Sequence, residues 1–154
     1  LSVEDKLRAL YDLQIIDRRV DEIRAMRGEL PLEVEDLENE VAGMETRMEK
    51  VNHEIADLEV DIKEKQLLIK ESQEKMAKYA KDQEQVRNNR EFEAIAKEIE
   101  YQELEIQLAE KRIREFSARI EAKKEANEAS TEKLNDRKTH LSHKVSELDS
   151  IMSE

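Results

Sequence analysis

Two histidines, His140 and His143, lie one helical turn apart near the end of the sequence. Imidazoles at this spacing can bind a metal ion such as Zn²⁺. The sequence has no Cys, and no acidic residue stands in an evident position for a third ligand. We therefore interpret both as surface histidines and expect no metal site. Asp and Glu number 39, so a pair of carboxylates carries no information about acid–base catalysis.

Sequence signatures of enzymes are absent. The chain has no Gly-rich phosphate-binding loop, no Cys nucleophile and no Gly-x-Ser-x-Gly elbow. No apolar run approaches the roughly 20 residues that span a membrane. We therefore expect no catalytic residue, no cofactor bound by this chain and no membrane segment. Function must be sought on surfaces.

The most distinctive local sequence runs from Val86 to Phe92, where two Asn lie between two Arg. Asn tolerates the left-handed conformation that ends helices, so we expect Asn88 and Asn89 to stop one helix and Glu91 to lie in the first turn of the next. The same segment can also contact partners. The candidate partner-binding residues are Arg87, Asn88, Asn89, Arg90, Glu91 and Phe92.

Nucleic-acid binding is the alternative for this segment, because Lys and Arg neutralise phosphates. Its candidate residues are Lys75, Lys78, Lys81, Arg87 and Arg90. The net charge of −12 opposes this alternative. So does the stretch from Glu29 to Asp61, where twelve acidic residues stand against two basic ones. Phe92 is also the only aromatic residue there on which a base can stack.

Two long helices must position these residues. Apolar residues recur with alternating spacings of three and four from Val34 to Val86 and from Phe92 to Ile151, the pattern of a coiled-coil seam. Charged residues make up 43% of the chain and aromatics 3%, with two Gly and one Pro, a composition typical of coiled coils. We predict an all-α fold, a long antiparallel coiled-coil helical hairpin.

The single coiled-coil domain, residues 1–154, is predicted in four parts. An N-terminal helical segment covers 2–27, with Ser2 and Asp5 capping its start. The first long arm covers 32–86, the hairpin tip 87–91 and the returning arm 92–151. Between the first two parts, Gly28 and Pro31 disfavour helix, so we expect a kink or a break there. Both alternatives stay open.

The pairing register follows from the seams, because opposite residues in an antiparallel hairpin have numbers with a constant sum. A sum of 178 places apolar residues opposite one another, for example Leu37 and Leu141, and leaves room for a tip. It also sets four cations against apolar residues, over which their aliphatic stems can lie: Lys65, Lys123, Arg137 and Lys144. Asn127 falls at a weakly apolar position, where it either fixes the register or marks a point of local opening.

The stretch from Val86 to Glu100 resembles the signature of a bacterial family of coiled-coil proteins with a C-terminal C4-type zinc ribbon. That signature reads Val-Lys/Arg-Asn-Asn-Arg/Lys-Glu-Tyr-x-Ala-Leu-x-Lys-Glu-Ile-Glu, and here Phe92 replaces the Tyr and Ile95 the Leu. The early spacing of Leu10, Leu13 and Asp17 and the dipeptide Leu30-Pro31 are similar to the family as well. The resemblance covers the whole chain as the family's N-terminal hairpin.

The resemblance implies a hairpin with the ribbon packed at its open end. Family members are described as candidate nucleic-acid-binding proteins. Some are adaptors in flagellar or type III secretion systems that bind an alternative sigma factor, export components or a flagellin message. The family's zinc belongs to the C-terminal ribbon. This chain reaches Glu154 without a Cys, which places zinc and ribbon-borne functions outside it.

We expect a non-enzymatic adaptor or scaffold, or a chaperone-like protein, that binds protein partners through the tip and the helical flanks. Leu1 is not Met, and Leu1 to Asp5 is not the start of a signal peptide. We therefore expect a fragment of a cytoplasmic bacterial protein. Two helices bury only one narrow stripe of each other, so a two-helix rod is marginally stable alone. We therefore expect a second copy of the chain or a partner domain at its open end.

Overall fold

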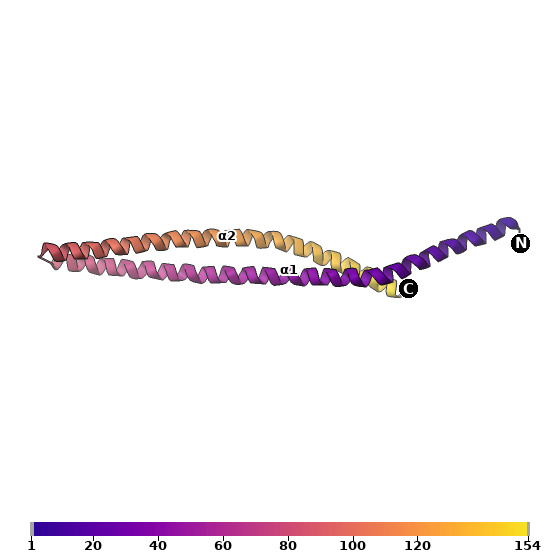
Figure 1. Ribbon diagram of the computed structural model, residues 1–154, viewed down its shortest axis with the longest axis horizontal. Coiled ribbons are helices and arrows are strands. Elements are labelled where there is room, and N and C mark those ends of the chain that lie inside the picture. The colour runs from indigo at the N-terminus through magenta and orange to yellow at the C-terminus, as the bar shows by residue number, and fades with distance from the viewer. Residues whose placement is uncertain (1, 154) are drawn as a thin grey trace. The chain divides into compact units, whose positions relative to one another are not determined.

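The computed structural model describes residues 2–153 and is an all-α helical hairpin. Helix α1 covers Val3–Gln85 and helix α2 covers Asn89–Ser153 (Figure 1). The chain divides into two compact units. One contains residues 2–47 and 130–153, and the other contains residues 48–129, including the hairpin tip. Within each unit the two helices pack against each other along the predicted seam.

Helix α1 begins at the predicted cap and does not end at Gly28 or Pro31. The backbone N–H of Asp5 donates a hydrogen bond to Ser2 Oγ at 3.1 Å, as a helix N-cap requires. Gly28 and Pro31 lie inside the helix. The alternative of a break at these residues is therefore wrong. Leu30, between them, is only 4% exposed, and this burial offsets the local cost of Gly and Pro.

The core is a narrow seam rather than a globular interior. The buried apolar side chains are Leu30, Val34, Leu37, Val41, Ile55, Ala109, Ile120, Leu134 and Ile151. All except Leu30 belong to the two predicted runs. No large side chain among the described residues is fully buried, because two helices can enclose only one stripe of each other's surface.

Two hydrogen bonds between the helices, one in each unit, lie within one residue of the predicted register. In the unit with both ends of the chain, Arg27 contacts Ile151, and these residue numbers add up to 178. In the unit with the tip, Asn127 Nδ2 donates a hydrogen bond to Asn52 Oδ1 at 2.8 Å, and these numbers add up to 179. Asn127 is therefore partnered across the seam, which supports its interpretation as a register residue.

Candidate functional site: the hairpin tip

The tip is a three-residue connection, residues 86–88, between the two helices. Asn88 is the N-cap of α2. Its Oδ1 accepts a hydrogen bond from the backbone N–H of Arg90 at 2.8 Å. Its backbone carbonyl accepts the first bond of the helix, from the N–H of Phe92 at 3.0 Å. Asn is among the residues that N-caps prefer for this side-chain bond.

The expected left-handed conformation of Asn88 and Asn89 is wrong. No non-Gly residue has a positive φ angle in the part of the chain that the structure describes. Asn88 initiates α2 instead of terminating α1, and Asn89 is the first residue of α2. The predicted tip bounds, 87–91, are therefore wrong: the connection covers residues 86–88, and Asn89 and Arg90 are helical. Glu91 lies in the first turn of α2, as its other interpretation predicted.

A second bond closes the tip from the side of α1. Gln83 Nε2 donates a hydrogen bond to the backbone carbonyl of Phe92 at 3.2 Å, which ties the last turns of α1 to the first turn of α2. Val86 is half-buried, whereas the Phe92 side chain remains 48% exposed. The backbone of the tip is thus held by its own polar groups, while an aromatic ring stays available on its surface.

The six candidate partner-binding residues lie together, and all are exposed. Within residues 2–153, the side chains of Arg87, Asn89 and Arg90 make no hydrogen bond or ion pair. Their polar groups are therefore free to meet a partner. Glu91 lies in the first turn of α2, where a carboxylate is favoured by the helix dipole.

The three lysines of the nucleic-acid alternative lie on the last turns of α1, and all three are exposed. Lys75, Lys78 and Lys81 follow one another at intervals of three residues. Such residues drift around a helix of 3.6 residues per turn. The lysines therefore do not form one straight row toward Arg87.

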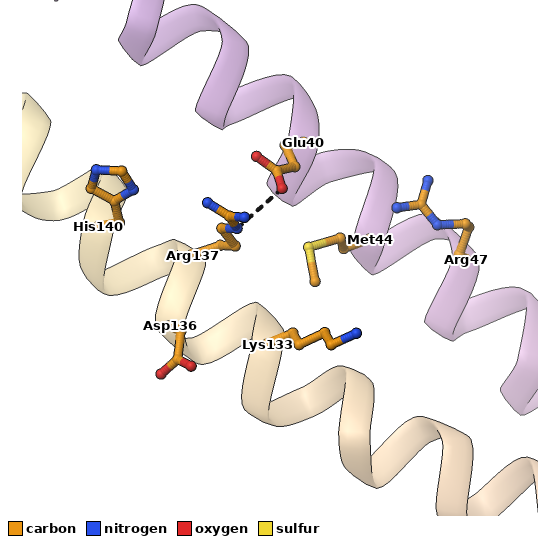
Figure 2. Close-up of a pocket in the computed structure, with 7 residues that line it drawn as sticks. All are labelled: Glu40, Met44, Arg47, Lys133, Asp136, Arg137 and His140. Atoms are coloured by element: carbon orange, nitrogen blue, oxygen red, sulfur yellow. Dashed lines mark ion pairs between the residues drawn. The ribbon is translucent and has the colours of Figure 1, made fainter.

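A groove lies between α1 and α2, far from the tip in sequence (Figure 2). It encloses about 640 Å³. Arg137 and Glu40 point toward each other across it, with 3.1 Å between Nε and Oε1. Seven residues line it: Glu40, Met44, Arg47, Lys133, Asp136, Arg137 and His140.

The chemistry of the groove is that of a solvated ion pair. The Glu40 carboxylate is already paired with the Arg137 guanidinium. His140 is exposed and lies in no group of three or more metal-ligating side chains; residues 2–153 hold no such group. Nothing in the groove forms a nucleophile–base pair, so the tip remains the better candidate site.

Ion pairs with lysines of α2 neutralise carboxylates in the acidic stretch of α1. Lys123 Nζ lies 2.6 Å from Glu54 Oε2, and this bond lowers the pKa of the Glu54 carboxyl. Lys144 Nζ lies 3.1 Å from Glu33 Oε2. The Glu33 carboxylate, with help from Glu147, raises the pKa of Lys144. Three of the four predicted seam cations, Lys123, Arg137 and Lys144, therefore pair with carboxylates of the acidic stretch.

Sequence reasoning missed one surface feature near the tip. Tyr101, Leu104 and Leu108 are all exposed on α2. Their own spacing of three and four residues, out of phase with the seam, was the signal that marked a second apolar stripe. The Glu105 carboxylate beside Tyr101 raises the pKa of the Tyr101 phenol.

No helix in the described residues is both long and apolar enough to cross a membrane. Comparisons were made with protein-family models, with curated proteins and with solved structures. None of the three returned a match for this chain.

Proposed function

We propose that this chain is a non-enzymatic scaffold that binds protein partners through its hairpin tip, residues 87–92. The observation that carries the proposal is the contrast between backbone and side chains at the tip. Asn88 and Gln83 hold the backbone, whereas Arg87, Asn89 and Arg90 are exposed and unpaired within residues 2–153. A backbone that is ordered before binding loses little conformational entropy of its own when a partner docks.

The exposed groups define the kind of partner. Arg87 and Arg90 can each bond a carboxylate through two N–H groups, and the Phe92 ring offers apolar area beside them. Arg and aromatic residues dominate the binding energy of protein interfaces. The partner is therefore a protein surface with a carboxylate next to an apolar pocket. The sequence resemblance at Val86–Glu100 supports an alternative sigma factor or a component of flagellar or type III export as that partner.

The test compares two variants of equal charge. In the tip variant, Arg87→Ala is combined with Arg90→Ala, which leaves the Asn88 cap in place. In the control variant, Lys111→Ala is combined with Arg114→Ala, two exposed cations elsewhere on α2. Partners captured from cell extract of the source organism should be lost with the tip variant and kept with the control. Equal capture by both variants overturns the proposal.

RNA binding is the second candidate, and one observation favours it. Lys75, Lys78 and Lys81 are exposed and, like Arg87 and Arg90, make no ion pair within residues 2–153. Binding that neutralises phosphates weakens steeply with salt, because counterions are released. A titration with single-stranded RNA at rising salt distinguishes the candidates. A steep slope that the tip variant reduces favours RNA, whereas no measurable binding leaves the protein scaffold.

A further inference from the structure

Residues 3–20 carry apolar side chains that no part of the described chain covers. Every residue from 2 to 22 is exposed, and the contact of α1 with Ile151 of α2 lies further along α1, at Arg27. The exposed apolar side chains before Arg27 are Val3, Leu7, Leu10, Tyr11, Leu13, Ile15, Ile16 and Val20. Apolar residues this dense on one helix indicate a surface that meets a partner.

One line along this helix has an internal symmetry. Alternating spacings of three and four select Val3, Lys6, Leu10, Leu13, Asp17 and Val20, which lie on one face of a helix. We call this line the N-terminal stripe. Residues whose numbers add up to 23 are then Val3 with Val20, Lys6 with Asp17, and Leu10 with Leu13. Each residue of the stripe thus has a complement within the stripe.

We infer that the N-terminal stripe pairs with the same stripe of a second copy of the chain, as an antiparallel dimer. In that arrangement each apolar residue meets an apolar residue. Lys6 of each copy meets Asp17 of the other, so the one cation and the one anion of the stripe are both matched. Leu7 and Ile16 flank the contact on either side of each helix.

Charge favours the antiparallel orientation of the two helices and a second copy of the chain as the partner. A parallel dimer would place Lys6 against Lys6 and Asp17 against Asp17, and facing like charges are destabilising. Residues 2–27 carry six acidic and six basic residues, so the segment is neutral, although the whole chain has a net charge of −12. Two copies of this segment therefore approach without the repulsion that acts between the rest of the two chains.

Cysteine cross-linking tests the arrangement, because the natural sequence has no Cys. Val3→Cys and Val20→Cys chains are prepared separately, with tags of different mass. In the antiparallel dimer the two Val3 positions are about 26 Å apart along the helix, so neither variant oxidises to a dimer alone. The mixture should form the mixed disulfide. Disulfides within each variant alone would indicate the parallel arrangement and overturn the inference.

Charge exchange tests the specific pairing. Sedimentation of the purified chain over a range of concentrations should show a monomer–dimer equilibrium. Lys6→Asp should raise the dissociation constant roughly tenfold or more, since the pair occurs twice in each dimer and attraction becomes repulsion. Adding Asp17→Lys to Lys6→Asp should restore dimerisation. The control is Tyr11→Ser, which removes an exposed ring that lies outside the N-terminal stripe. It should leave the monomer–dimer equilibrium unchanged.

A chain that stays monomeric at all concentrations overturns the inference and assigns the apolar face to a different occupant. So does a dimer that Lys6→Asp leaves intact. Circular dichroism of each variant checks that helicity is retained. These measurements use the purified chain alone. A negative result therefore counts against the dimer and not against partner binding by the tip.

Discussion

The Arg27 guanidinium donates hydrogen bonds to the backbone carbonyl of Ile151, at 3.4 Å from Nε and 3.3 Å from Nη2. The last carbonyls of a helix lack intrahelical partners and carry partial negative charge. No basic residue lies in the last turn of α2 itself. Arg27 of α1 therefore supplies the cation that this helix end lacks.

Arg27→Met keeps the aliphatic stem and removes the donors. We expect it to lower the free energy of unfolding by about 0.5–1 kcal/mol and to speed hydrogen exchange in the last turn of α2. Equilibrium urea unfolding and amide exchange measure the two effects. Arg24→Met, a nearby exposed position, is the control. Equal effects of the two substitutions would show that the contact with Ile151 does not stabilise α2.

The bond between Lys123 and Glu54 predicts a dependence on pH. Because Lys123 lowers the pKa of Glu54 in the folded state, its stabilisation is present above the unfolded pKa and is lost as pH falls through the folded value. Glu54→Gln mimics the protonated carboxyl. We expect the native chain to be more stable than this variant at pH 7 and the difference to vanish as pH falls well below 4.5. A difference that persists at low pH would contradict the ion pair as its cause.

Lys144 predicts the opposite pH dependence. Glu33 raises its pKa, so the contribution is complete below the unfolded value and is lost as pH rises through the folded one. Lys144→Met should therefore be less stable than the native chain at pH 7, and the difference should shrink above pH 10.5. Thermal unfolding of both chains at pH 7, 9 and 11 measures this difference in stability. If the difference is the same at all three values, the Lys144 stem rather than its charge provides the stability.

The seam and its register could be predicted from sequence because both depend on a pattern repeated over many residues. Registers that keep both seams facing each other differ by a whole heptad, so few alternatives compete. The partners of the seam cations could not be predicted. The register predicts only that the Lys123 stem lies over an apolar residue. Glu54 lies one residue before the seam position that Lys123 faces, within reach of its ammonium group.

Two local features were harder to predict, each for a physical reason. Asn is favoured both at the end of one helix and at the start of the next, so the sequence alone does not distinguish the two roles of Asn88. At Gly28 and Pro31, intrinsic propensity favours an interruption. Burial of Leu30 and the contact of Arg27 with Ile151 favour a continuous helix, and these tertiary terms are not visible in local sequence.

The cap at the tip predicts different effects for the two adjacent asparagines. Asn88→Ala removes the acceptor for the Arg90 N–H and should lower the free energy of unfolding by about 1 kcal/mol. Asn88→Asp keeps an acceptor and should cost little. Asn89→Ala, at the first position of α2, should change stability by only a few tenths of a kcal/mol. Urea unfolding ranks the three; a larger loss for Asn89→Ala would contradict the assignment of the cap.

The two glycines of α1 predict a gain in stability. A Cβ added at Gly28 meets nothing within 4 Å, so Gly28→Ala should raise the free energy of unfolding by about 0.5–1 kcal/mol through lower backbone entropy of the unfolded chain. At Gly43 the Cβ would lie 3.2 Å from Arg47 Nη1. That flexible side chain must move, so Gly43→Ala should gain less. Urea unfolding compares them. A loss of stability for Gly28→Ala would mean that α1 needs the conformational freedom of glycine at this position.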